Sequence, residues 1–319
     1  MKAYAYAPGK IIICGEHFVV YGATALAAAI NRGTTAEAEP SPTTTTIYSK
    51  DFGLQADLST NNIPERLKPL AATITAVKEH LDEKKGVKLT IQSDLPPRSG
   101  LGSSSSAAVA TAAASALALG HKLPLEDVIK LAMSAERIVH KNPSGIDVQV
   151  STRGGLLLFK KGSQPELLQL KKKVRFVIAS TGVERETGEL VERVRVWRER
   201  NPSLFNSLVE SVTILSRCCA EALILGDLKR VGAILNFFHT TLSWLGVSIK
   251  EIDQIVEAAL SSPSALGAKL TGAGGGGSVI ILCSEEGAED VVKSVSKIAS
   301  ETFITPLPNK GVKTWIKKS

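Results

Sequence analysis

The chain has 319 residues, of which 44% are hydrophobic, 22% are charged and only 5% are aromatic. This length and hydrophobic content support a buried core in one large or two moderate domains and exclude a wholly disordered chain. Because aromatic residues are few, the core must consist mainly of Ala, Val, Ile and Leu, which suits helices layered on sheets. No signal sequence opens the chain, and no uncharged apolar run reaches the roughly 18 residues of a membrane span. We therefore expect no membrane association.

The formal net charge is +7, from 38 basic and 31 acidic residues spread along the chain. Neither a dense basic stretch with interleaved aromatic residues nor a nucleic-acid-binding motif is visible, so we expect no nucleic-acid partner. The four cysteines, Cys14, Cys218, Cys219 and Cys283, lack C-x-x-C spacing and include an adjacent pair. Such an arrangement does not suit a disulfide framework, and it favours a reducing, cytoplasmic location.

Strand and helix patterns alternate through the first half of the chain. Short apolar runs predict strands over residues 3–6, 10–14 and 87–91, and a Thr-rich alternating stretch predicts a hairpin over residues 34–48. Helical spacing of apolar residues predicts a helix over residues 63–81 and another over residues 125–139. Residues 103–119 are dominated by Ala and begin with serines that are good N-caps, which predicts a further helix.

The second half is rich in predicted helices. Helical patterns occupy residues 188–200, 204–225, 228–244, 249–260 and 288–300. Predicted strands occupy residues 156–159, 174–180, 268–270, 278–283 and 311–315. We place a soft domain boundary near residue 172, because neither a repeat nor a long linker separates the halves.

The first candidate phosphate site is the serine loop, residues 96–106, with the sequence Pro-Pro-Arg-Ser-Gly-Leu-Gly-Ser-Ser-Ser-Ser. It places two glycines and a run of hydroxyls directly before the Ala-rich helix. Free N–H groups and the helix dipole both favour an anion at such an end. The alternative is an N-capped helix after a flexible loop, for which one or two serines suffice.

The second candidate is the glycine loop, residues 272–277, where five of six residues are glycine. Ordering so many glycines costs much backbone entropy, which suggests the close approach of a ligand rather than a long hairpin turn. The chain contains no G-x-x-x-x-G-K-[ST] motif and no G-x-G-x-x-G after a strand. A phosphate site in this chain must therefore use another scaffold.

Charged residues stand at the ends of several predicted elements. Lys10 begins an apolar strand, Glu16 and His17 follow its end, Glu136 lies late in a helix, and Asp147 follows a turn. Singly, these residues suit a surface lysine, a solvated helix face, a turn carboxylate and a core histidine. Phosphoryl transfer to an alcohol needs a bridging metal, a group that accepts the hydroxyl proton and nearby positive charge. Together with the two loops, these residues predict an active site.

The motifs resemble, in order and over nearly the whole chain, those of the GHMP kinase superfamily, which includes galactokinase, homoserine kinase, mevalonate kinase and phosphomevalonate kinase. The sequence is most similar to the mevalonate kinase branch. The matching segments are Ala-Pro-Gly-Lys-Ile-Ile-Ile-Cys-Gly-Glu-His at 7–17, Pro-Pro-Arg-Ser-Gly-Leu-Gly-Ser-Ser at 96–104, Asn-Pro-Ser-Gly-Ile-Asp at 142–147, residues 236–248, and Lys-Leu-Thr-Gly-Ala-Gly-Gly-Gly-Gly at 269–277.

This resemblance implies an α+β, two-domain GHMP kinase fold with the active site in the cleft between the domains. Residues 1–172 would form an N-terminal mixed α/β nucleotide-binding domain, and residues 173–319 a ferredoxin-like α+β domain. The activity implied is the ATP- and Mg²⁺-dependent phosphorylation of (R)-mevalonate to 5-phosphomevalonate in the isoprenoid pathway. Mevalonate and ATP would be the small-molecule partners, and a homodimer is one option for the assembly.

The resemblance also assigns roles to residues. Asp147 would be the general base, and Lys10 would stabilise developing negative charge beside it. Glu136 and a serine would bind Mg²⁺. The residues implied to bind the substrate are Glu16, His17, Arg185 and Thr187. Those implied to bind ATP are Pro97, Arg98, Ser99, Gly100, Leu101, Gly102, Ser103, Ser104, Ser105, Ser106, Gly272, Ala273 and Gly274.

The serine loop departs from the family pattern, because four serines precede Ala107 and Ala108 where the family usually has two. Counting from Gly102 makes Ser104 the metal ligand, whereas counting back from Ala107 makes it Ser106. We assign Ser104, because the loop fixes the phosphate geometry.

Other acceptors and another class of protein stay open. A phosphomevalonate kinase or a mevalonate 3-kinase would keep the fold and change the acceptor, whereas Glu16 and His17 argue by resemblance against a sugar acceptor. A non-catalytic ATP-binding regulator is the alternative from a different class. The presence of Lys10, Glu136 and Asp147 together argues against it.

Overall fold

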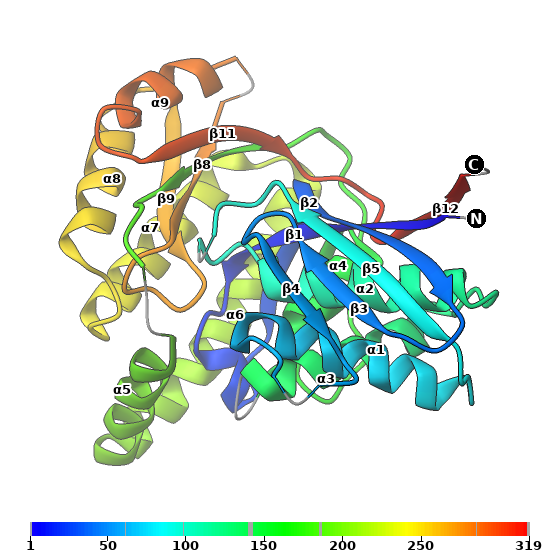
Figure 1. Cartoon of the computed structure of the whole chain (residues 1–319). Helices are drawn as coiled ribbons and strands as arrows, with labels where there is room; N and C mark the ends of the chain where they lie inside the picture. Colours follow the sequence, from blue (N-terminus) through cyan, green and yellow to red (C-terminus); the bar gives the residue numbers. More distant parts are fainter. Residues whose placement is uncertain are drawn as a thin grey trace.

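Two β-sheets, each covered by helices, organise the chain into two lobes (Figure 1). The structure is a computed structural model that describes residues 2–60, 62–97, 99–139, 143–184, 187–284 and 286–317. This architecture confirms the α+β class expected from the sequence. Residue 172, the predicted domain boundary, lies between the strand Glu166–Leu168 of the larger sheet and the strand Arg175–Ser180 of the smaller sheet.

The larger sheet has eight strands in the order β12-β1-β2-β5-β3-β4, with β6 pairing with β2 and β7 pairing with β6. The strands are β1 (Lys2–Cys14), β2 (Ala25–Ser41), β3 (Thr46–Ser49), β4 (Leu54–Asp57), β5 (Gly86–Ser93), β6 (Leu156–Phe159), β7 (Glu166–Leu168) and β12 (Lys313–Lys317). The two short strands predicted near the N-terminus are one long strand, β1, whose register on β2 shifts between Pro8 and Lys10.

The hairpin predicted over residues 34–48 is wrong. Residues 34–41 belong to β2 and residues 46–49 to β3, but β5 lies between these two strands. Strand β5 pairs antiparallel with β2 and parallel with β3. In the β3–β5 pair, Ile47 is opposite Leu89. Alternating Thr residues indicate extended backbone on a half-buried surface, but they do not specify which strand will be the partner.

Helices cover one face of the larger sheet and form the N-terminal lobe with it. They are α1 (Lys68–His80), α2 (Ser103–Ala118), α3 (Leu125–Val139) and α4 (Ile146–Arg153). The core between helices and sheet is built from small side chains, with Ala5, Ala7, Ala36 and Ala38 of the sheet and many alanines of α2 buried together. The predicted helices near residues 63–81, 103–119 and 125–139 are confirmed, whereas α4 was not predicted.

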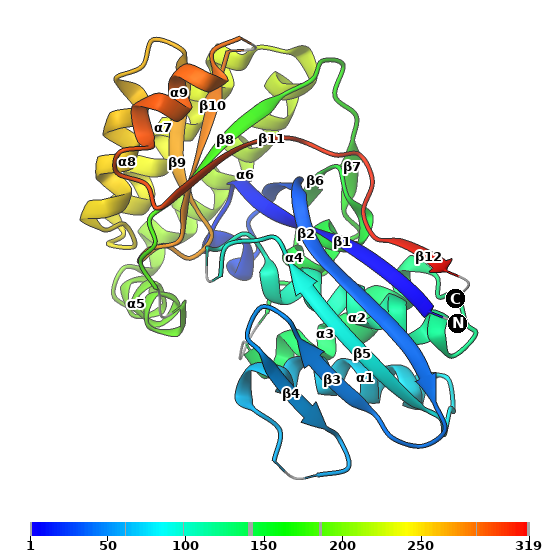
Figure 2. The same ribbon diagram turned by 45° about the horizontal axis from the view of Figure 1, so that its top comes forward.

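The C-terminal lobe contains the smaller sheet, with the antiparallel order β11-β8-β10-β9 (Figure 2). Its strands are β8 (Arg175–Ser180), β9 (Ala265–Thr271), β10 (Ser278–Cys283) and β11 (Glu301–Pro306), and its helices are α5 (Thr187–Arg200), α6 (Pro202–Leu225), α7 (Leu228–Trp244), α8 (Lys250–Leu260) and α9 (Ala288–Val295). Of these elements of the C-terminal lobe, β11 was not predicted from the sequence; β4 and β7 of the larger sheet were not predicted either. Among the described helices, none combines the length and the apolar character needed to cross a bilayer.

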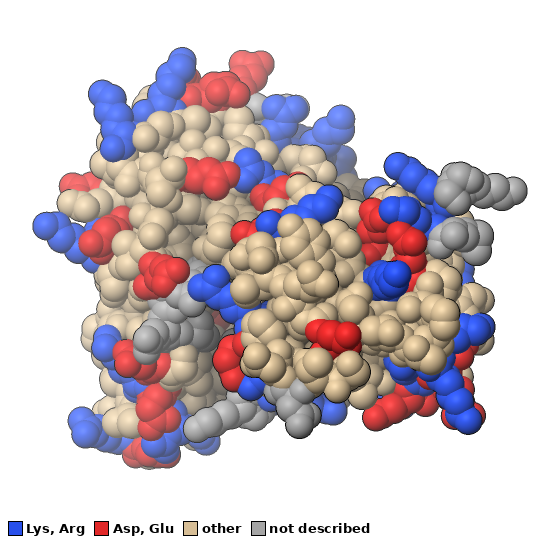
Figure 3. Space-filling model, in the orientation of Figure 1, with Lys and Arg blue, Asp and Glu red and all other residues tan. Residues whose placement is uncertain are grey.

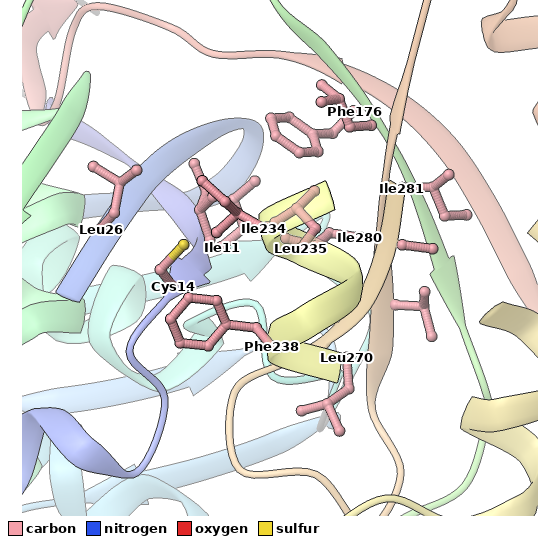
Figure 4. Packing of buried hydrophobic residues seen from close by; sticks show 14 of the residues in the cluster. Ile11, Cys14, Leu26, Phe176, Ile234, Leu235, Phe238, Leu270, Ile280 and Ile281 are labelled. Atoms are coloured by element: carbon pink, nitrogen blue, oxygen red, sulfur yellow. The ribbon is translucent and has the colours of Figure 1, made fainter. Parts of the chain in front are cut away.

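One hydrophobic core is shared by the two lobes (Figure 4). Ile11, Cys14 and Leu26 of the larger sheet are buried in the same cluster as Phe238 of α7 and Ile280 of β10. Helix α6 contacts β1, β2 and α7, so it packs against both lobes. Because protein cores are densely packed, the shared core holds the two sheets in one relative arrangement.

Charged side chains are interspersed on the molecular face shown in Figure 3, where neither sign covers a continuous area. Surface ion pairs, such as those of Arg195 with Glu192 and Glu199 on α5, contribute to this mixing. The net charge of +7 is therefore distributed rather than concentrated on this face.

Helix α7 approaches β9 so closely that only glycine fits at Gly232. A Cβ atom there would lie 2.0 Å from the carbonyl oxygen of Leu266. We expect Gly232→Ala to lower the free energy of unfolding by about 1–3 kcal/mol, because backbone must shift to make room. Gly188→Ala in α5 is the matched control, because a Cβ atom there meets nothing within 4 Å. Equal denaturant midpoints for the two variants would contradict the close approach.

Candidate active site

Lys10 and Asp147 form the ion pair around which the candidate site is arranged. Lys10 lies in β1 and is almost fully buried, and its Nζ is 3.2 Å from Asp147 Oδ1. Asp147 stands in the first turn of α4. The residue directly before this helix is Gly145, which has a left-handed backbone conformation. The Asp147 side chain keeps 28% of its surface exposed, so solvent or a ligand can reach the carboxylate.

The serine loop lies directly on this part of β1. The backbone N–H of Lys10 donates to the carbonyl of Leu101 at 2.8 Å. Gly102 has a φ of 77°, and a Cβ atom there would lie 2.9 Å from Lys10 Cγ. The loop therefore needs glycine at this position for its left-handed backbone and its contact with the Lys10 side chain.

Helix α2 begins at Ser103, and Gly102 rather than a serine is its N-cap, without a side-chain hydrogen bond from any described residue. The prediction that serines cap the helix is therefore wrong. The serines occupy the first turn instead, where the leading backbone N–H groups have no partner within the helix. Such an end attracts anions.

The four serines differ in their surroundings. Ser105 is buried and its Oγ donates to Glu136 Oε1 at 2.6 Å, whereas Ser104 is exposed. The Ser106 hydroxyl lies 2.8 Å from Thr34 Oγ1 and donates to the carbonyl of Ser103. Of these side chains, the one in contact with the Glu136 carboxylate is therefore Ser105.

The residues around Glu136 suit a hard divalent cation such as Mg²⁺. Glu136 in α3 is 4% exposed and its carboxylate accepts a hydrogen bond from the Ser105 hydroxyl, so oxygen atoms gather there. Among the described residues, no three His, Cys, Asp or Glu side chains gather into a closed metal site. Mg²⁺ usually keeps several waters and takes only one or two carboxylates beside substrate phosphates, so the site fits the ion.

The glycine loop connects β9 to β10 and contacts three other segments. The N–H of Gly275 donates to the carbonyl of Val247 at 2.8 Å, and the carbonyl of Gly277 accepts from Thr181 N at 2.8 Å. A Cβ atom on Gly274, whose φ is 80°, would lie 2.0 Å from the Val247 oxygen. The loop is therefore packed against its neighbours rather than extended into solvent.

Glu16 and His17 contact the C-terminal lobe. Glu16 is 1% exposed and its Oε1 pairs with Nζ of Lys269 in β9. His17 has a φ of 61°, and its Nε2–H donates to the carbonyl of Ala273 in the glycine loop at 3.0 Å. Non-glycine residues with such backbone angles cluster at functional sites. The turn after β1 is therefore joined to the glycine loop.

Burial raises the pKa of the Glu16 carboxyl, while the positive charges of Lys269 and Lys10 lower it. Oε2 of Glu16 is buried and has no hydrogen-bond partner among the described residues. A buried carboxylate oxygen without a donor is costly, so this atom is a candidate acceptor for a ligand's hydrogen bond.

The structure does not place every residue predicted for the site. Arg98 and Arg185 lie outside the described residues, and so does Asn142. Thr187 is the first residue of α5, and nothing is described of its side chain. Pro97 is exposed, and Ser99 is buried with a hydroxyl that has no partner in the described part of the chain.

Lys269 and Thr271 were assigned no role from the sequence, yet both contact the β1 segment of the site. The Thr271 hydroxyl accepts from the N–H of Ile12 at 2.9 Å and lies 3.2 Å from its carbonyl. The signal that could have identified Lys269 is a lysine inside an apolar strand, because buried charges need partners.

A surface pocket of about 470 Å³ lies away from these residues, beside α1. Its lining mixes the hydroxyls of Thr43 and Thr44 with Lys78, Glu79 and Asp82, and it includes none of the predicted site residues. The candidate site is therefore defined by its contacts rather than by this pocket.

A chain of contacts links the polar groups: Glu136 to Ser105 in the first turn of α2, Gly102 before that turn to Lys10, and Lys10 to Asp147. These contacts group four parts together: a helix end that attracts anions, a buried ammonium, a carboxylate able to accept a proton and a second carboxylate for a cation. These are the parts that phosphoryl transfer requires.

The chain matches known proteins over nearly its whole length. Residues 68–155 match the family model for the GHMP kinases N terminal domain, and residues 219–300 match that for the GHMP kinases C terminal. A mevalonate kinase of Aeropyrum pernix is 35% identical, with 98% of each chain covered. One of Pyrococcus furiosus is 36% identical, also with 98% of each covered.

Solved structures give the same result. The Methanococcus jannaschii mevalonate kinase superimposes with a TM-score of 0.83 at 26% identity, over 97% of this chain and 98% of that one. The L. major mevalonate kinase in complex with R-mevalonate gives 0.80 at 28% identity, over 96% of each chain. With two family models matched, near-complete relatives at about a third identity and a common fold, the chain belongs to the GHMP kinase family.

Proposed function

We infer that this chain is a mevalonate kinase, which transfers the γ-phosphoryl group of ATP to the 5-hydroxyl of (R)-mevalonate. The observation that carries the inference is the contact between Lys10 and Asp147, next to the uncapped start of α2. Near-full-length relatives from Aeropyrum pernix and Pyrococcus furiosus bear the same name. The products are 5-phosphomevalonate and ADP.

Asp147 acts as the general base. Its partly exposed carboxylate accepts the proton of the substrate hydroxyl while the hydroxyl oxygen bonds to the γ-phosphorus and the bond to the ADP oxygen breaks. Lys10 places a buried positive charge within 3.2 Å of that carboxylate. Its ammonium stabilises the negative charge that develops on the transferred group and the attacking oxygen.

The start of α2 holds the phosphates of ATP. Backbone N–H groups of Gly100, Leu101, Gly102 and Ser103 are available beside Lys10, and the helix dipole favours negative charge there. Gly272, Ala273 and Gly274 approach the same phosphates from the C-terminal lobe. The contact between His17 and Ala273 supports this placement of the glycine loop.

Glu136 and one hydroxyl of the serine loop hold Mg²⁺. Held by these residues, the ion would supply positive charge that offsets the charge of the phosphates. The sequence count assigns the hydroxyl to Ser104, whereas the 2.6 Å contact with Glu136 favours Ser105. Glu16, His17, Arg185 and Thr187 are proposed to face the acceptor, with Oε2 of Glu16 free to accept a hydrogen bond from it.

We place the reaction in the cytoplasm, with no nucleic-acid or membrane partner. The cysteines are free thiols, which suits a reducing compartment. A homodimer stays an expectation.

Purified protein with Mg²⁺ and ATP should release ADP with (R)-mevalonate as acceptor, and 5-phosphomevalonate should form in equal amount. Phosphomevalonate, galactose and homoserine are the comparison acceptors, and ADP release and the phosphorylated product are both measured. A preference for any of these over mevalonate would refute the substrate assignment, and no turnover with any alcohol would favour a non-catalytic ATP-binding protein.

Asp147→Asn should lower kcat by about 10²–10⁴-fold, because the amide cannot accept the hydroxyl proton. ATP binding, measured by calorimetry, should change little, because the phosphates bind at α2. Asp290→Asn is the matched control on an exposed face of α9. A kcat within a few-fold of wild type for Asp147→Asn would rule out general-base catalysis by this residue.

Ser105→Ala should raise the Mg²⁺ concentration that gives half-maximal activity by about 10–100-fold, the size of effect seen when groups that orient a metal site are removed. Ser104→Ala should leave it near the wild-type value, because Ser104 is exposed. The measurement is a Mg²⁺ titration at saturating ATP and mevalonate. The reverse order of effects would identify Ser104 as the ligand.

Gly274→Ala should lower kcat/KM for ATP by more than about tenfold while the fold is retained. The added methyl collides with the Val247 oxygen and forces the glycine loop to move. Far-UV circular dichroism monitors the fold, and Gly162→Ala, another glycine with positive φ but with open space around its Cβ position, is the control. Similar kinetics for both variants would show that the packing of this loop does not matter for ATP use.

A further inference from the structure

Lys269 is a fully buried lysine whose ammonium is saturated by oxygen acceptors. It stands in β9 with 0% of its side chain exposed. Nζ donates to Glu16 Oε1, to the carbonyl of Leu270 at 2.6 Å and to the carbonyl of Ile12 at 3.3 Å. All three donor positions are used, so the charge of Lys269 is held in one place.

Two residues of β9 contact the same short segment of β1. Lys269 and Thr271 are two positions apart, so they face the same side of the strand. Both bond to the backbone of Ile12, which is two residues beyond Lys10. The C-terminal lobe is therefore bonded to β1 directly beside the lysine of the Lys10–Asp147 pair.

Charges of alternating sign continue from the ion pair to the C-terminal lobe. Asp147 contacts Lys10, the charge of Lys10 is among those that lower the pKa of Glu16, and Glu16 contacts Lys269. Glu16 thus places a negative charge within electrostatic reach of Lys10. Its Oε1 is bonded to Lys269, and Oε2 has no partner among the described residues.

We propose that Lys269 is a positioning residue for phosphoryl transfer: it keeps Glu16 ionised and fixed within electrostatic reach of Lys10. Lys269 acts through Glu16 and does not itself touch the reacting atoms. This inference rests on the proposed kinase activity. It explains why the contact between the lobes uses two buried charges, since an apolar pair would hold the same interface without the cost of removing charges from water.

Other titratable groups near the Lys269–Glu16 pair have pKa shifts whose main cause is their own burial. Burial, with the neighbouring Cys219 thiol, raises the pKa of Cys14, so that thiol stays neutral. Burial lowers the pKa of His239, whose Nε2 lies 3.3 Å from Asp253 Oδ1. Lys10 and Lys269 are the cations that lower the pKa of Glu16, against the burial that raises it.

Replacement of Lys269 should make kcat and thermal stability depend on pH in different ways. Replacement of a residue with a purely structural role would not do so. In Lys269→Met, burial of Glu16 is no longer opposed by the ion pair, so the pKa of Glu16 rises further. Below that raised pKa, Glu16 is protonated and kcat should fall about tenfold per pH unit, as expected for one required ionisation. Above it, kcat should recover.

Stability should move in the opposite direction. A carboxyl whose pKa is higher in the folded state than in the unfolded state loses stability as pH rises between the two values. The thermal midpoint of Lys269→Met should therefore decrease over the pH range in which its kcat increases.

The experiment compares wild type, Lys269→Met, Glu16→Gln, the double variant Lys269→Met/Glu16→Gln and the exposed control Lys293→Met. For each, kcat, KM for both substrates and the thermal midpoint are measured from pH 6 to 9, a range chosen to span about three units around neutrality. The acceptor is mevalonate, or whichever alcohol the wild type phosphorylates. The double variant should regain thermal stability, because no unpaired charge stays buried, but its kcat should stay low and flat with pH.

A wild-type pH profile in Lys269→Met, or wild-type kcat in the double variant, would overturn the proposal. The kinase activity itself is decided by the wild-type protein, so failure of the proposed function and failure of this inference give different results. If Lys269→Met does not fold, the comparison of Glu16→Gln with the double variant decides: a large further loss of kcat, independent of pH, would mean that Lys269 acts without Glu16.

Discussion

The bonds between the ends of β9 and β1 determine how the two lobes meet. Lys269 and Thr271 bond to the backbone of Ile12, and Lys269 also pairs with Glu16. β1 carries Lys10, and β9 leads directly into the glycine loop. Because these bonds are buried and the two lobes share a hydrophobic core, the loop and the lysine occupy fixed relative positions. The site is thereby assembled from parts nearly the whole length of the chain apart, without depending on a flexible hinge.

Much of the fold follows from local sequence patterns, and the parts that do not are long-range. The Ala-rich α2 and the amphipathic α3 begin and end close to where residues 103–119 and 125–139 predicted them. Each is a continuous helix whose pattern is independent of its partners. By contrast, the position of β5 between β2 and β3 depends on pairing across more than 40 residues, as between Thr46 and Lys88, and no local signal specifies it. The short helix α4 follows a turn and was too brief for its period to be recognised.

The candidate site likewise has features that the sequence predicted and features that it could not predict. The sequence predicted a functional pairing of Lys10 with Asp147, and the structure places them in contact. It could not predict which serine meets Glu136, because successive helical residues point about 100° apart and counting from a loop does not fix that rotation. Ser105 rather than Ser104 faces Glu136. The partner of Lys269 was equally hidden, since a lysine in a strand gives no indication of which distant carboxylate will neutralise it.

The last strand, β12, pairs with β1 along Lys2–Tyr6, so the chain ends in the sheet where it began (Figure 1). The strands of the C-terminal lobe, β8 to β11, therefore stand in the chain between β7 and β12, two strands of the N-terminal sheet. Until β12 pairs with it, one edge of β1 is uncovered, although the other strands of that sheet precede β12 in the chain. An unpaired edge can recruit other strands. Pairing of β12 with β1 thus also closes an edge that would otherwise be open to aggregation.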